Sequence, residues 1–129
     1  MTTLTIDGSR IHDIQSFYDE INRVFMGGEA WQLGPSLDAL NDLFYGGYGA
    51  LKDAETVEII WRNIEHSRQA LGHDATRAYY FEKLEHPDTF DTARFRRELA
   101  ALDRGLGPTY FDLVMRIIAD RPNIRLVEQ

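Results

Sequence analysis

The stretch LGPSLDALNDLFYGG, residues 33–47, gives the clearest indication of how this chain folds. Gly34 and Pro35 are expected to start a helix over about 35–45, because proline suits a first helical turn, and Ser36 is expected to be a cap at its start. The segment YGGYG at 45–49 is expected to end it. One side of this helix is apolar, at the spacing of a buried helical face, and consists of Leu33, Leu37, Leu40 and Phe44. The helix therefore has one side for a core and another for solvent.

The solvent side of this helix carries two carboxylates and no cation. Asp38 and Asp42 are four residues apart, and the stretch 33–47 contains no Lys or Arg. Like charges at this spacing cost about a few tenths of a kcal/mol, and Asp is a poor helix former. The spacing alone does not explain why a short helix keeps two carboxylates on one face without a neutralising neighbour.

The acidic charge of the chain is concentrated in its first part. Residues 1–60 hold ten Asp and Glu against three Lys and Arg, whereas residues 61–129 hold eleven of each, so the net charge of −7 lies in the first part. An acidic surface repels nucleic-acid phosphates and attracts basic partners. We therefore expect a basic partner and no direct nucleic-acid binding. The plainer alternative, that the charge only aids solubility, stays open here.

The length and composition are those of one folded domain. Of the 129 residues, 43% are apolar and 27% are charged, and there is no cysteine, which excludes disulfides and thiolate chemistry. The N-terminus lacks the pattern of a signal peptide, and no apolar run approaches the ~18 residues of a membrane helix. We expect a single domain over 1–129 that is cytoplasmic and has no membrane contact.

Strand and helix patterns alternate along the chain. Short β-branched runs bounded by polar residues predict strands at 2–6, 56–61 and 123–127. Asp13 and Asp91 are expected N-caps, and Pro108 is expected near the N-cap or first residue of the last helix. The predicted helices cover about 12–26, 35–45, 64–71, 74–85, 91–104 and 107–120. Strands separated by helical segments indicate an α/β fold with a parallel sheet.

No pattern of a catalytic or metal site stands out. The glycine-rich segments lack the lysine of a phosphate-binding loop, and no serine lies in a nucleophile elbow. Four histidines occur without metal-ligand spacing, namely His12, His66, His73 and His86. We expect no cofactor and no metal. The pair Asp38 and Asp42 has a separation that suits acid–base chemistry, so a small enzyme stays an alternative.

Aromatic residues occur on both sides of the acidic helix. Trp31, Tyr45 and Tyr48 flank it, and aromatic side chains beside charges are typical of binding hot spots. Packing is an equally good explanation for these three. A second group, residues 79–81, has the sequence YYF, and at most two of three consecutive side chains can face a core.

The pattern Gly34-x-x-Leu37-Asp38-Ala39-Leu40-x-Asp42, followed by YGG, resembles the barstar family of bacterial ribonuclease inhibitors. The order around it agrees: an opening strand with IDG, a helix, the acidic helix, and a strand that runs into WRNIEHSRQ. The tail TYFDLVMRIIADRPNIRLV is similar to the last helix and strand of that family. The resemblance covers about 1–71 and 107–128. It implies a barstar-like fold, with a three-stranded parallel sheet and packed helices. Residues 72–106 would be a two-helix insertion before the last helix, as in a longer barstar-like subgroup.

The resemblance also implies a function without catalysis. A barstar-like immunity protein plugs the basic active site of a secreted guanyl-type ribonuclease, or of a ribonuclease toxin, in a 1:1 complex inside the cell. Asp42 would enter the phosphate-binding site and face arginine and histidine groups there, and Asp38 would support it from the same side. The remaining residues of the expected partner-binding set are Asn41, Trp31, Gly34, Tyr45 and Tyr48.

Three positions depart from the best-known type of this family. Asn41 and Gly47 stand where that type has bulky aromatic residues, and Arg116 stands roughly where it has an acidic residue. Tyr45 or Tyr48 is expected to supply the missing aromatic contact. The departures leave a second hypothesis open, a barstar-like module for a basic partner that is not a ribonuclease.

Overall fold

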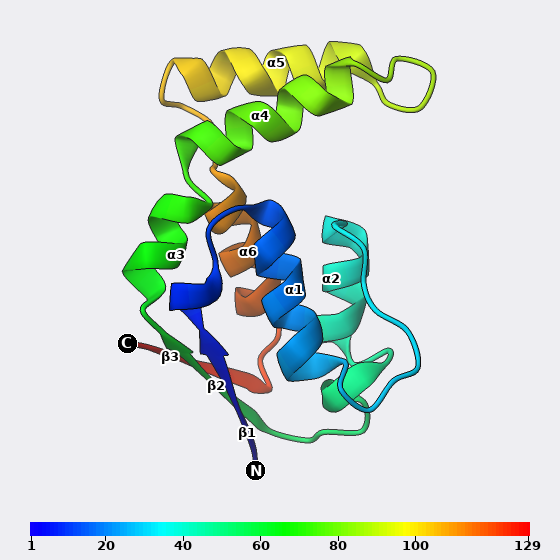
Figure 1. Ribbon diagram of the computed structural model, residues 1–129, viewed down its shortest axis with the longest axis vertical. Helices are drawn as coiled ribbons and strands as arrows, with labels where there is room; N and C mark the ends of the chain where they lie inside the picture. Colours follow the sequence, from blue (N-terminus) through cyan, green and yellow to red (C-terminus); the bar gives the residue numbers. More distant parts are fainter.

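The computed structural model describes residues 1–129, an α/β fold built on a three-stranded sheet (Figure 1). The strands are β1 (Thr2–Asp7), β2 (Val57–Arg62) and β3 (Ile124–Glu128), paired in the order β1-β2-β3. Both pairs are parallel, and helical segments make each crossover, as parallel strands require. The predicted strands and parallel sheet are confirmed.

All six predicted helices are present. They are α1 (Ile14–Phe25), α2 (Leu37–Tyr45), α3 (Ile64–Ala70), α4 (His73–Leu84), α5 (Thr92–Asp103) and α6 (Tyr110–Ala119). Two short 3-10 helices are η1 (Gly8–Arg10) and η2 (Gly49–Leu51). The predicted N-caps Asp13 and Asp91 are confirmed. None of the helices combines the length and apolar character that a membrane crossing needs.

The predicted position of Pro35 is wrong by a small step. The helix α2 begins at Leu37, and the hydroxyl of Ser36 caps it, as predicted, by accepting the backbone N–H three residues on, at 3.2 Å. Pro35 therefore precedes the helix. Thr109 caps α6 in the same way, and Pro108 lies directly before this cap, close to the predicted position. A hydroxyl at the N-cap satisfies a free helix N–H, which proline cannot do.

Most apolar side chains gather in one core between the sheet and the helices α1, α2, α3 and α6. This core contains 21 buried residues. Trp61 of β2 is fully buried there, with its ring 6.2 Å from that of Phe17 and 5.7 Å from that of Phe111. We call residues 1–72 and 104–129, which form this core, the main body.

The two remaining helices, α4 and α5, lie side by side outside the main body (Figure 1). We call them, with the loop between them, the helical hairpin. It has a small core of its own, made of Tyr80, Phe95 and Leu102. Tyr79 is half-buried and Phe81 is 43% exposed, so the prediction that at most two of these consecutive aromatic side chains face a core is confirmed.

The hairpin is joined to the main body at the N-terminus of α6. The hydroxyl of Thr76 accepts the backbone N–H of Tyr110 at 2.7 Å and donates to the carbonyl of Gly72 at 2.7 Å. The ring of Tyr79 meets that of Tyr110 edge-on, 5.2 Å between centroids. The Tyr110 hydroxyl in turn lies 2.7 Å from that of Tyr18 in α1. This chain of contacts connects the hairpin to the centre of the main body.

Candidate functional site

The helix α2 is fixed to the main body by one face. Leu40, Leu43 and Phe44 are buried there, as the apolar spacing predicts for Leu40 and Phe44. Leu37 is only half-buried. Leu33 is buried, but it precedes the helix, so its predicted place on a helical face is wrong. The burial of three large side chains on a helix of nine residues leaves the position of α2 little freedom.

Neither carboxylate on the opposite face is neutralised within the protein. Asp38 and Asp42 are exposed, and none of the ion pairs of the structure includes them. Asp38 lies in the first turn of α2, where the partial positive charge of the helix N-terminus stabilises an acid. Asp42 is one turn further on. The pair offers two negative charges for charge-assisted hydrogen bonds with a cation from outside.

One cation does contact α2, but it binds residues beside the two aspartates. Arg121, which follows α6, donates from Nη2 to Oδ1 of Asn41 at 3.2 Å. Its guanidinium carbon lies 3.9 Å from the ring centroid of Tyr45, and its Nε is buried without a hydrogen-bond partner. Arg121 therefore holds Asn41 and Tyr45 and leaves the two aspartates free. The sequence identifies Arg121 only as part of the segment that ends the last helix. No sequence pattern connects it with Asn41, which lies 80 positions away.

Two of the predicted aromatic residues pack against each other beside α2. The rings of Trp31 and Tyr48 meet edge-on, 4.7 Å between centroids, and the Tyr48 hydroxyl donates to the carbonyl of Ala39 at 2.6 Å. Burial raises the pKa of Tyr48, and the nearby charge of Asp42 raises it further. Trp31 is 47% exposed and Tyr45, the last residue of α2, is 72% exposed. Tyr48 holds the helix in place, while Trp31 and Tyr45 offer aromatic surface to a partner.

The loop before α2 is fixed by a buried amide, Asn22, which no sequence pattern singles out. The Asn22 side chain donates to the carbonyl of Leu33 at 3.0 Å and accepts its N–H at 2.8 Å. The carboxylate of Glu29 accepts the N–H of Gly49 at 3.2 Å. Gly34, a predicted site residue, is exposed, and a Cβ there would meet nothing within 4 Å. The loop geometry therefore does not require glycine at position 34.

The structure places four of the predicted site residues on one helix, outside its buried face, and two more beside that helix. Asp38, Asn41, Asp42 and Tyr45 lie on α2, and Trp31 packs on Tyr48 next to the helix, as described above. No group of three or more His, Asp or Glu side chains is arranged to hold a metal ion. The arrangement suits recognition of a basic surface.

The fold and this site define the class as a small α/β protein that presents an acidic helix. The comparisons with known proteins then assign the family. The family described as barstar (barnase inhibitor) matches residues 1–86, from β1 to just beyond α4, and the chain belongs to the barstar family. The comparison with curated proteins gives no match. The predicted family and the barstar-like fold are both confirmed. The match ends at residue 86, so the resemblance predicted for residues 107–128 stays a prediction.

Proposed function

We propose that this protein is an intracellular immunity protein that inhibits a small guanyl-type ribonuclease, either secreted or a toxin. It binds the enzyme 1:1 in the cytoplasm and places the exposed face of α2 in the basic active site. Asp42 takes the position of a substrate phosphate, and Asp38 supports it from one turn earlier. Catalysis by the protein itself is not part of this function.

The observation that carries the proposal is the pair of exposed, unpaired carboxylates on a helix whose other face is buried. A carboxylate fixed on a rigid element loses little conformational entropy when it binds, and a guanidinium is its best-matched partner. Arg121, which contacts α2 directly, is occupied by Asn41 and Tyr45. Membership of a family of barnase inhibitors supports the ribonuclease as the target class.

Exposed aromatic side chains supply the apolar part of the proposed interface. Tyr45 is 72% exposed and lies on the guanidinium of Arg121, so its ring is held in place before a partner arrives. Trp31 is held in a similar way by Tyr48. Aromatic residues that are already ordered are typical hot spots, because little side-chain entropy is lost on binding.

The experiment is an inhibition titration with a panel of small guanyl-type ribonucleases, which includes barnase and any ribonuclease encoded in a neighbouring reading frame. Cleavage of a fluorogenic RNA oligonucleotide gives the apparent Kd. We expect Asp42→Ala to weaken inhibition at least about 30-fold, the conversion of a hot-spot effect of about 2 kcal/mol. Asp38→Ala is expected to have a smaller effect, and added salt to weaken the complex.

The matched control is Glu65→Ala. Glu65 is an exposed acid on α3, at the opposite side of the molecule from α2 (Figure 1), and pairs only with the exposed Arg68. Its removal is expected to leave inhibition unchanged. Inhibition that survives Asp42→Ala, or a panel with no inhibited enzyme, would contradict the proposal. A partner captured through α2 that has no ribonuclease activity would favour the alternative, a binding module for another basic protein.

A further inference from the structure

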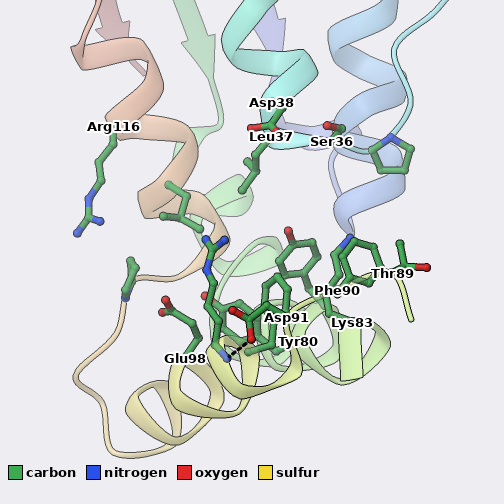
Figure 2. Close-up of a pocket in the computed structure, with 16 residues that line it drawn as sticks. Ser36, Leu37, Asp38, Tyr80, Lys83, Thr89, Phe90, Asp91, Glu98 and Arg116 are labelled. Carbon is green, nitrogen blue, oxygen red and sulfur yellow. Dashed lines mark hydrogen bonds between the residues drawn. The ribbon is translucent and has the colours of Figure 1, made fainter. Parts of the chain in front are cut away.

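A groove separates the acidic helix from the helical hairpin. It has a volume of about 590 Å³ and runs between the start of α2, the helices α4 and α5, and α6 (Figure 2). Its apolar surface comes from both sides, with Leu37 on α2, Leu113 on α6, and Tyr80 and Phe90 on the hairpin. The size and the mixed lining are those of a site for one or a few side chains of another protein.

The groove is continuous with the proposed binding face of α2. Ser36, Leu37 and Asp38 line one of its walls, and Figure 2 shows Asp38 and Leu37 at the end of α2 nearest the hairpin. A protein that covers Asp38 and Asp42 also reaches the mouth of this groove. The hairpin is therefore in position to contact the same partner as α2.

The walls away from α2 carry cations that have no acidic partner. Lys83, Arg94 and Arg116 line the groove, and none of them takes part in an ion pair of the structure. The Lys83 ammonium lies 4.0 Å from the ring centroid of Phe90, and the Arg94 guanidinium lies 5.3 Å from that of Phe95. Cations held over aromatic rings are positioned, yet still able to bind a carboxylate.

Two carboxylates share these walls, and one of them has a structural role. Asp91 accepts the backbone N–H of Arg94 at 3.1 Å and so caps α5. Glu98 is half-buried on the next turn. With Asp38 on the α2 wall, the groove is lined by three acids and three cations, so its lining has no net charge. The three unpaired cations all lie on the walls away from α2, across the groove from Asp38.

We propose that this groove binds an acidic loop of the same ribonuclease that α2 inhibits. A carboxylate of the loop pairs with Arg94 and Arg116, and an adjacent apolar side chain packs against Phe90 and Leu113. The inference rests on the proposed function, which it extends: the preferred enzymes have a basic active site flanked by an acidic loop. The hairpin then acts as the part of the inhibitor that selects the enzyme.

Charge reversals test the proposal, with the most strongly inhibited ribonuclease of the panel as the probe. We expect Arg94→Glu and Arg116→Glu each to raise Kd at least about tenfold, because like charges then face each other across the interface. Arg97→Glu is the matched control. Arg97 is exposed on the same helix, α5, but does not line the groove, so Kd should change less than about twofold.

The outcomes separate this inference from the function on which it rests. If Asp42→Ala abolishes inhibition while Arg94→Glu and Arg116→Glu bind like the parent, the groove proposal is wrong and the inhibitor function stands. If Asp42→Ala also has no effect, the proposed function itself is wrong.

Hydrogen exchange of the unchanged protein gives a readout that does not depend on the folding of a variant. Amides of residues 85–95 should exchange more slowly in the saturated complex, and unchanged rates would overturn the proposal. Slower exchange in the free protein at high concentration, together with the mass of a dimer, would show that a second copy fills the groove and would also overturn it.

Discussion

The main body and the helical hairpin use the same kinds of side chains but bury them to different extents. The core of the main body contains 21 residues, with Phe111 completely buried, whereas the hairpin has three, and its Phe95 is 9% exposed. Stabilisation by apolar burial grows with the area removed from water. The acidic helix belongs to the more stable region, and the opposite wall of the groove belongs to the less stable one.

The polar contacts of the hairpin do little to offset its small core, because they are mostly exposed. Asp103, at the end of α5, lies 3.0 Å from Nε of Arg77 and 3.7 Å from Nε2 of His73. Exposed pairs of this kind contribute about 0–1 kcal/mol. Regions with few buried contacts open locally more often than a core does. The comparison indicates a fixed acidic helix beside a hairpin that opens locally more often.

The largest expected effects come from replacing one core phenylalanine with alanine in each region, Phe111 in the main body and Phe95 in the hairpin. Phe111→Ala should lower the free energy of unfolding by about 4 kcal/mol, and Phe95→Ala by about 2 kcal/mol, because the partly exposed site leaves a smaller cavity. Urea unfolding measures both. Equal costs would mean that the hairpin is as well packed as the main body, and would break the comparison.

The junction between the regions depends on one hydroxyl. Thr76→Val keeps the side-chain shape but leaves the buried N–H of Tyr110 without the acceptor that it has at 2.7 Å. The expected cost is about 2 kcal/mol. Hydrogen exchange should show faster opening of α4 and α5 than of β2. If hydrogen exchange became faster by the same factor across the whole chain, both regions would unfold as one unit.

Alkaline pH should weaken the contact between α1 and α6. Burial raises the pKa of Tyr18 and of Tyr110 above the unfolded value of about 10. The folded state then keeps protons that the unfolded state releases, so this stabilisation is complete below pH ~10 and is lost as the pH rises above it. The expected slope is about 1.4 kcal/mol per pH unit for each tyrosine.

The control for this prediction is the double variant Tyr18→Phe with Tyr110→Phe. It removes both members of the hydrogen bond, which costs little when the shapes are kept, and it should reduce the slope above pH 10 in urea titrations. Part of the slope remains, because burial also raises the pKa of Tyr48, Tyr79 and Tyr80. A parent protein whose stability stays constant from pH 8 to pH 11 would contradict the prediction.

The smallest expected effects come from the helix caps, one in each region. Ser36→Ala removes the cap of α2, and Asp91→Ala removes the cap of α5. Each should cost about 1 kcal/mol of local stability. In thermal unfolding, Ser36→Ala should lower the midpoint of the main transition, whereas Asp91→Ala should affect mainly the unfolding of the hairpin. If Ser36→Ala left the main transition unchanged and Asp91→Ala lowered it, α2 would be the less firmly held helix.

Local patterns were sufficient to predict most of the fold. Short β-branched runs marked the strands, and apolar spacing marked the helices to within a few residues, because both follow from how a chain buries one face. The error at Pro35 has a local cause as well. The hydroxyl of Ser36 makes a better cap than proline, and α2 starts after it.

The candidate site was predictable only in part. The spacing of Asp38 and Asp42 places them on one helical face, and the buried face of α2 follows from the same periodicity. The contacts of Asn22 with Leu33 and of Arg121 with Asn41 join residues that the sequence keeps apart. Such pairs depend on how the elements pack in three dimensions, for which a single sequence contains no local signal.

The division of α2 into a buried and a free face has a consequence for how the sequence of this helix can vary. Leu40, Leu43 and Phe44 are buried, and Leu37 and Ala39 pack partly against the same core, so the exposed positions 38 and 42 can mutate with little change in stability. The exposed face of this fold can therefore change through a few substitutions while the helix keeps its place. A library randomised at these positions should contain mostly folded proteins and could be selected directly for new targets.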